Sequence, residues 1–169
     1  MFNNINIDKV ALNVFRKPTT ERTIRQIAKE VNLSPATAAK CVKALEQKNI
    51  IKARKIAKSH LITGNIDSDT YKFYKKIANM ISLEELNIRI KQQNPQAVVL
   101  YGSYSRGEDM EKSDVDIAII GEKFDIDLQK IEEKIGRNIH LLFFDSFKEI
   151  PPQLKKNLYN GVKLQGVLP

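Results

Sequence analysis

LYGSYSRGEDMEKSDVDIAII, residues 100–120, is the stretch that decides the fold and chemistry of the second half of the chain. It runs from an apolar strand through a polar turn into a second apolar strand, expected over 114–120. Because residues i and i+2 of a strand share a face, Asp114 and Asp116 point the same way. Two like charges on one strand face repel each other, and a divalent cation would offset that repulsion. The pair predicts a metal site for Mg²⁺ or Mn²⁺.

The other end of the same stretch predicts a phosphate site. Gly102 ends a buried strand expected over 97–102, and a glycine there lets the backbone bend tightly and approach a ligand. Ser103 begins a short helix, whose first backbone N–H groups and dipole favour a phosphate. A phosphate site beside a metal site is what phosphoryl or nucleotidyl transfer requires. We therefore expect an NTP, with ATP as the first choice, as the substrate.

This arrangement, Gly-Ser followed by ten residues and then Asp-Val-Asp, resembles the core motif of the DNA polymerase beta nucleotidyltransferase superfamily. The resemblance covers about residues 83–165. The compact layout is similar to the minimal nucleotidyltransferases of that superfamily, which include antitoxin partners of HEPN-domain toxins. The resemblance implies nucleotide contacts from Gly102, Ser103 and Arg106, and metal ligation by Asp114 and Asp116. For Arg106 the residues leave a second role open, a surface ion pair with a local carboxylate.

The family pattern also has a third carboxylate on the adjacent strand, in a Gly-Arg-x-hydrophobic-Asp segment. This chain reads GRNIHL over 136–141, with His140 at that position. As a catalytic residue, a neutral histidine can act as a base or ligate a metal softer than magnesium. It can also mark a site that binds a nucleotide without turning it over, or be purely structural. Asp145 lies five residues further on and would reach the site only if the strand bends.

The first half of the chain is strongly basic. Residues 1–75 carry 15 Lys and Arg against 6 Asp and Glu, a net charge of +9, whereas residues 76–169 carry 13 against 14, or −1. The whole positive excess of the +8 chain therefore lies in the first half. A charge asymmetry of this kind suggests separate roles for the two halves and a polyanionic partner for the basic one.

The first half has the pattern of a helix-turn-helix followed by a wing. A first helix is expected over 8–16, and Thr19 or Thr20 is expected to cap a second helix. A third helix begins at Ser34-Pro35, with a capping hydroxyl and a proline at the first helical position. The β-prone segment after that helix predicts a two-stranded wing. Two helices joined by a tight turn are typical of helix-turn-helix proteins.

LSPATAAKCVKALEQKNII, residues 33–51, resembles the winged helix-turn-helix of many prokaryotic regulators, over about residues 8–64. The resemblance implies double-stranded DNA as a partner. The third helix lacks an Arg or Asn for bidentate base reading, so contacts to the DNA backbone are expected. The expected DNA-contacting residues of the third helix and the wing are Thr37, Lys40, Lys43, Lys52, Arg54, Lys55 and Lys58. His60, on the wing, is expected to be a surface residue.

Composition and patterning predict a protein of mixed α+β or α/β class. The expected domains are a winged helix over 1–66, a linker helix over 67–82 and a small mixed-sheet nucleotidyltransferase domain over 83–169. Cys41 is the only cysteine and is expected to pack in the core of the third helix. No apolar run approaches the roughly 20 residues of a membrane span, and the start lacks a signal-peptide pattern. A cytoplasmic protein is expected.

Two hypotheses about function remain at this point. The first is a metal-dependent nucleotidyltransferase that moves NMP from an NTP to a hydroxyl acceptor and also binds DNA. The second is a DNA-binding transcriptional regulator, or an antitoxin-like protein, whose nucleotide-binding domain has lost catalysis. His140 in place of the third carboxylate favours the second hypothesis. A toxin or other protein partner and a homodimer are compatible with both.

Overall fold

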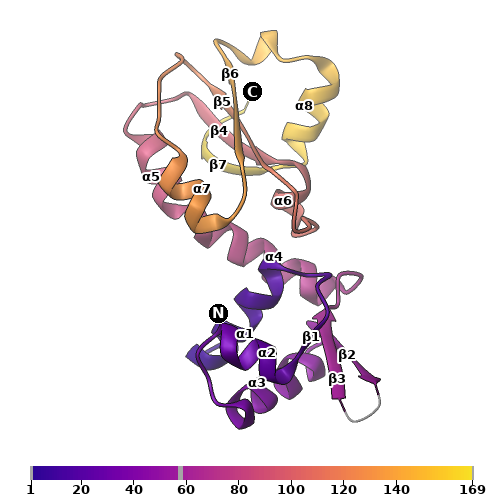
Figure 1. Cartoon of the computed structure of the whole chain (residues 1–169). Helices are drawn as coiled ribbons and strands as arrows, with labels where there is room; N and C mark the ends of the chain where they lie inside the picture. Colours follow the sequence, from indigo (N-terminus) through magenta and orange to yellow (C-terminus); the bar gives the residue numbers. More distant parts are fainter. Residues whose placement is uncertain (1, 57–58, 169) are drawn as a thin grey trace. The chain divides into compact units, whose positions relative to one another are not determined.

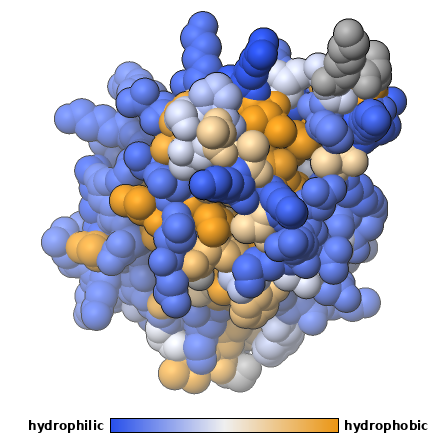
Figure 2. All heavy atoms as spheres, turned by 90° about the horizontal axis from the view of Figure 1, so that it is seen from below, coloured by the Kyte–Doolittle hydropathy of each residue, from blue (hydrophilic) through white to orange (hydrophobic). Residues whose placement is uncertain are grey.

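The computed structural model of the chain describes residues 2–56 and 59–168, and the chain divides into two compact units, Met1–Lys75 and Lys76–Pro169. The stretch expected to be a linker helix is occupied by α4, Asp69–Ser82. Hydrophilic side chains cover most of the face seen in Figure 2, and apolar side chains gather in smaller areas of it. In the described part of the chain, no helix is both long and apolar enough to span a membrane.

The N-terminal unit contains helices α1 (Ile5–Arg16), α2 (Ile24–Glu30) and α3 (Pro35–Gln47) (Figure 1). Its antiparallel sheet has the order β1-β3-β2, formed by Arg22–Thr23, Ser59–Gly64 and Ile51–Ile56. Strands β2 and β3 form the predicted wing. The first helix starts three residues earlier than predicted, because the Asn4 side chain accepts hydrogen bonds from the backbone N–H groups of Asn6 and Ile7.

The start of the second helix differs from the prediction. Arg22 and Thr23 pair with β3, so the helix cannot begin until Ile24. Thr23, and not Thr19 or Thr20, is the N-cap: its side chain accepts a hydrogen bond from the backbone of Gln26. The Gln26 side chain in turn accepts one from the backbone N–H of Thr23, which completes a capping box.

The third helix begins as predicted. The Ser34 hydroxyl accepts a hydrogen bond from the backbone N–H of Thr37 at 3.1 Å, and Pro35 occupies the first helical position. Ala38, Cys41, Val42 and Leu45 form its buried face. Burial raises the pKa of the Cys41 thiol, which agrees with a packing role.

A buried arginine ties the helices of this unit together. Arg22 is only 3% exposed, and its guanidinium donates to Asn13, to the backbone carbonyl of Lys17 and to Glu30. Its Nη1 lies 3.1 Å from Glu30 Oε2. Because a buried charge without partners is very unfavourable, this network fixes β1 against α1 and α2.

The C-terminal unit contains a mixed sheet of order β6-β5-β4-β7. The strands are β4 (Ala97–Tyr101), β5 (Val115–Ile120), β6 (Ile139–Phe144) and β7 (Val162–Gly166). The pair β5 and β6 is parallel, whereas β4 runs antiparallel to β5 and β7. The helices are α5 (Glu84–Lys91), α6 (Gly102–Arg106), α7 (Gln129–Ile135) and α8 (Pro152–Tyr159), with a 3₁₀ turn at Phe147–Glu149.

Helices cover both faces of this sheet. One face packs Val98, Leu100 and Ile117 against residues of α5 and α7. The other face packs Ala118 and its neighbours against Leu158 of α8. Apolar residues on both faces explain why the strands read as continuous apolar runs instead of alternating ones.

Ser82 does not cap α5, although its position before that helix suggests a cap. The Ser82 hydroxyl donates to the backbone carbonyl of Asn79 at 2.6 Å and lies 2.8 Å from the Tyr104 hydroxyl. Leu83 occupies the N-cap position of α5 without a side-chain cap. Leu83 is only 1% exposed, so burial of its apolar side chain holds the bend between α4 and α5.

Candidate functional site

The parallel pairing of β5 and β6 brings the predicted catalytic residues together. Asp116 lies opposite His140 in the register of the two strands, and Asp114 directly precedes β5. His140 Nδ1 is 3.7 Å from Asp116 Oδ1 and 4.0 Å from Asp114 Oδ2. The strand starts of β5 and β6 thus form one end of the sheet with two carboxylates and an imidazole.

These side chains are partly open to solvent. The exposed fractions are 38% for Asp114, 33% for Asp116 and 57% for His140. Burial raises the pKa of Asp116 above its usual range; the neighbouring His140 opposes this rise, and the Asp114 carboxylate adds to it. Asn138 Nδ2 donates to Asp114 Oδ1 at 3.2 Å and gives that carboxylate one polar partner.

Gly102 lies close to the Asp116 carboxylate, on the side of the neighbouring strand β4. It follows β4, whose last residue Tyr101 pairs with Asp116. Its φ of +75° is in the left-handed region, and a Cβ added to it would lie 2.6 Å from Asp116 Oδ2. A glycine is therefore needed both for the backbone turn and for the space beside Asp116. Ser103 is half-buried at the start of α6.

Arg106 forms a local ion pair, and Asp145 lies at the opposite end of β6 from His140. Arg106 Nε donates to Glu108 Oε2 at 2.7 Å, which is the local ion pair that the sequence left open as its second role. Asp145 follows β6 beyond Phe144, and Phe144 pairs with Ile120 at the far end of β5. The five-residue separation from His140 corresponds to about 16 Å along an extended strand. Asp145 is therefore outside the site, because the strand does not turn back.

The donor set suits a hard divalent cation. Mg²⁺ usually takes one or two carboxylates and completes its shell with phosphate oxygens and water. Asp114 and Asp116 are such a pair, and the missing side chain of Gly102 leaves space beside Asp116 Oδ2. Within the described residues, no three His, Cys, Asp or Glu side chains are grouped to hold a metal by themselves. The remaining ligands of a cation bound here would have to come from a substrate and water.

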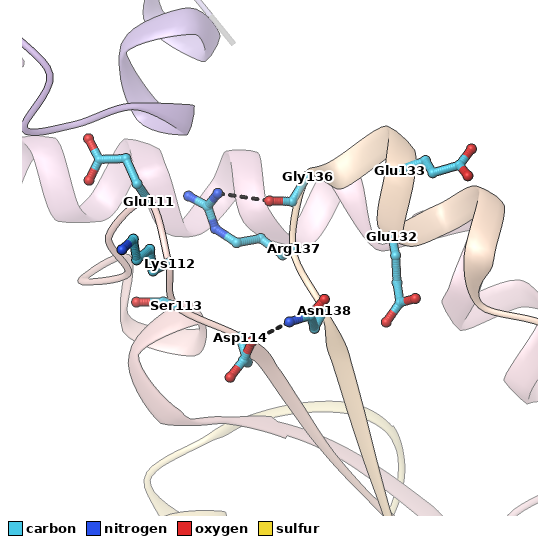
Figure 3. Close-up of a pocket in the computed structure, with 9 residues that line it drawn as sticks. All are labelled: Glu111, Lys112, Ser113, Asp114, Glu132, Glu133, Gly136, Arg137 and Asn138. Carbon is cyan, nitrogen blue, oxygen red and sulfur yellow. Dashed lines mark hydrogen bonds between the residues drawn. The ribbon is translucent and has the colours of Figure 1, made fainter.

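A pocket of about 320 Å³ adjoins Asp114 (Figure 3). Figure 3 shows the hydrogen bond from Asn138 to Asp114 at its edge and the Arg137 guanidinium bonded to the carbonyl of Gly136. The pocket is lined by Glu111, Lys112, Ser113, Asp114, Glu132, Glu133, Gly136, Arg137 and Asn138. Arg137 and Asn138 are not among the site residues predicted from the sequence. They directly precede β6, the strand that carries His140, and this position in the sequence is the signal that could have indicated a role near the site.

Two family models match the chain. Residues 84–164 match the family described as polymerase beta, nucleotidyltransferase. The C-terminal unit is a polymerase beta-type nucleotidyltransferase domain. Residues 21–52 match the family described as winged helix-turn-helix DNA-binding, so the N-terminal unit is a winged-helix domain of the kind that binds DNA. Both matches agree with the fusion predicted from the sequence. No curated protein matches the chain.

In the winged-helix domain, those predicted DNA-contacting residues that the structure describes lie on α3 and β2. On α3, Lys40 and Lys43 are exposed and Thr37 is half-buried, with its hydroxyl 2.8 Å from that of Ser34. On β2, Lys55 is exposed and pairs across the strands with His60, an exposed residue as expected.

Carboxylates engage two basic residues of the wing. Lys52 Nζ lies 2.8 Å from Asp67 Oδ2, and Arg54 Nη2 lies 2.7 Å from Glu21 Oε1. Both ion pairs are exposed, so each contributes little to stability and can be exchanged for a phosphate. The predicted contact Lys58 lies outside the described residues.

Proposed function

We propose that the nucleotidyltransferase domain binds an NTP together with Mg²⁺ or Mn²⁺ and transfers NMP to a hydroxyl acceptor. The observation that carries this proposal is the meeting of Asp114, Asp116 and His140 at one end of the sheet, with Gly102 placed against Asp116. ATP is the nucleotide to test first. The acceptor is a hydroxyl of a protein, a nucleic acid or a small molecule.

The proposed reaction is a single displacement at phosphorus. The acceptor oxygen forms a bond to the α-phosphorus, the bond from that phosphorus to the bridging oxygen breaks, and pyrophosphate leaves. Asp114 and Asp116 would hold the divalent cation, which when bound neutralises phosphate charge. Gly102 and Ser103 would bind phosphate oxygens through the backbone at the start of α6.

His140 is the group in this arrangement that can take a proton. The ring nitrogen of a neutral imidazole can accept one, and His140 occupies the position of the family's third carboxylate. We assign it the proton of the acceptor hydroxyl. Arg106 would reach a phosphate by exchanging its partner Glu108, since the two side chains are 52% and 38% exposed.

The second candidate function is regulation of transcription, or an antitoxin-like role, by a winged-helix protein whose nucleotide site does not turn over. The replacement of the third carboxylate by His140 favours it, because that carboxylate would otherwise complete the metal site. The basic α3 and wing support DNA binding in either case. In this second function, a bound nucleotide would serve as a signal instead of a substrate.

Labelled ATP with Mg²⁺ or Mn²⁺ separates the two functions. Pyrophosphate release with transfer of label to an acceptor, lost in Asp114→Ala and retained in Asp125→Ala, supports the enzyme. Asp125 is an exposed aspartate of the same domain and serves as the matched control. Binding of ATP without turnover, abolished by Asp114→Ala, supports the regulator. If the wild-type protein neither binds nor turns over any NTP, the nucleotide site itself is wrong.

A further inference from the structure

A buried polar cluster lies behind the candidate site and is not used by the proposed chemistry. Asp109, in the loop between α6 and β5, is 2% exposed. Its Oδ1 accepts a hydrogen bond from Asn79 Nδ2 at 2.7 Å, and its Oδ2 is 3.5 Å from Arg137 Nη2. The Arg137 side chain is 7% exposed and Asn79 is 6% exposed. Three elements, α4, the loop and the start of β6, therefore meet at one carboxylate.

Asp109 is the buried residue of the loop 108–114. Of residues 108–114, all within the described part of the chain, only Asp109 is buried. The others are half-buried or exposed, so the loop has no apolar anchor of its own. An ionised carboxylate in the interior is tolerated only when hydrogen bonds and an opposite charge satisfy it. Asn79 and Arg137 meet that requirement and in doing so define where the loop lies.

Each member of the cluster also adjoins one wall of the candidate site. Asn79 Nδ2 donates to the backbone carbonyl of Tyr104 at 2.9 Å, in the helix that begins with Gly102 and Ser103. Arg137 directly precedes Asn138, the residue that donates to Asp114. Asp109 lies in the loop that ends at Asp114. The phosphate side, the metal side and the His140 side of the site are thus tied to one another through the cluster.

We propose that Asn79, Asp109 and Arg137 are positioning residues, which set the spacing between α6, Asp114 and β6 without touching the nucleotide. This inference rests on the proposed nucleotide site for its consequence in binding, but its structural part concerns the loop alone. A cluster that served only stability would change the unfolding temperature and leave the native loop and the nucleotide affinity unaltered. A positioning cluster changes the loop and the affinity in protein that is still folded.

The test uses the full chain and two variants. Asp109→Asn keeps the shape of the side chain and removes its charge. Arg137→Lys keeps the positive charge and loses the planar guanidinium. The Arg137→Lys variant still tests the proposal if Asp109→Asn does not fold. Asp125→Asn, at an exposed site of the same domain, is the matched control. Each variant is studied well below its own unfolding temperature.

The first measurement is hydrogen exchange of the protein alone, followed by mass spectrometry. Peptides covering 108–114 are expected to exchange at least tenfold faster in Asp109→Asn and Arg137→Lys than in the wild type, while peptides of β4 and β5 stay protected. Unchanged exchange over 108–114 in a folded variant overturns the proposal, whatever the protein binds.

The second measurement is the affinity for ATP with Mg²⁺. We expect it to fall at least tenfold in both variants and to stay at the wild-type value in Asp125→Asn. Faster loop exchange with an unchanged affinity overturns the positioning role and leaves the proposed function standing. If the wild type itself binds no NTP, the proposed function has failed, and the hydrogen exchange still decides whether the cluster holds the loop.

Discussion

Replacing Gly102 with alanine tests the close approach on which the site is built. The backbone of Gly102 has a φ of +75°, and the new Cβ would lie 2.6 Å from Asp116 Oδ2. Ordinary contact begins at 3.4 Å, so the carboxylate would have to move by about 0.8 Å, the difference between the two distances. Asp116 is 33% exposed and its carboxylate can rotate, so we expect this displacement to occur without unfolding the domain.

The two consequences of Gly102→Ala differ in size. A left-handed conformation costs an L-residue roughly 1–2 kcal/mol, and each kcal/mol lowers the Tm of a domain of this size by about 4–8 °C. The effect on chemistry is larger, because misplacing a reacting or ligating group by about 1 Å costs on the order of 10²-fold. We therefore expect a moderate loss of stability and a large loss of Mg²⁺-dependent ATP binding or transfer.

Gly136→Ala isolates the backbone contribution. Gly136 has a φ of +72° and nothing within 4 Å of an added Cβ, so alanine there carries the strain without the clash. Thermal unfolding of the two variants should give similar losses in Tm, and titration of Gly102→Ala with Mg²⁺ and ATP should give the large loss in affinity. If Gly102→Ala shows the loss in Tm but binds ATP with the wild-type affinity, Asp116 does not act where the structure places it.

Four further changes test other parts of the molecule. Because burial raises the pKa of Asp116, the ionised form of this residue destabilises the folded protein at neutral pH. Asp116→Asn should therefore raise the Tm near pH 7, and this increase in Tm should disappear as the pH falls below about 3.9. His140→Asp adds a third carboxylate, so its Tm should fall in EDTA and rise more with Mg²⁺ than that of the wild type; an equal rise would exclude position 140 from the metal site. The double variant Lys40→Ala, Lys43→Ala should reduce the slope of log affinity for duplex DNA against log salt by about 0.9 per lost phosphate contact, measured by fluorescence anisotropy. Arg22→Ala removes a 3%-exposed guanidinium and its hydrogen bonds to Asn13, Lys17 and Glu30, and should cost about 1.5–3 kcal/mol in chemical unfolding; a cost below about 0.5 kcal/mol would contradict its role in tying the helices together.

The order of elements in the nucleotidyltransferase domain was predictable, because its strands are short apolar runs bounded by residues that break regular structure. Asn94-Pro95 separates α5, which ends at Lys91, from β4, and Pro151-Pro152 begins α8. The third helix of the winged-helix domain was equally clear from Ser34 and Pro35. In each case, local chemistry alone determines where an element begins or ends.

Long-range pairing was not predictable in the same way. Thr23 caps α2 because residues 22–23 first pair with β3, about forty residues further along the chain, and no local pattern reports that pairing. Arg22 and Asp109 belong to types that are almost always exposed, so their burial follows only from the partners that the fold brings to them. Arg137 and Asn138 lie beside the site for the same reason.

The parallel register of β5 and β6 also explains how two like charges are tolerated on one strand. Asp114 receives a hydrogen bond from Asn138, and Asp116 has His140 opposite, yet burial still raises the pKa of Asp116. The protein alone therefore compensates Asp116 only in part, chiefly because burial disfavours the ionised form of its carboxyl group. A cation bound beside Asp116 would stabilise this ionised form, which burial disfavours. The uncompensated cost of burying the Asp116 carboxylate thus favours the metal-bound state that we propose.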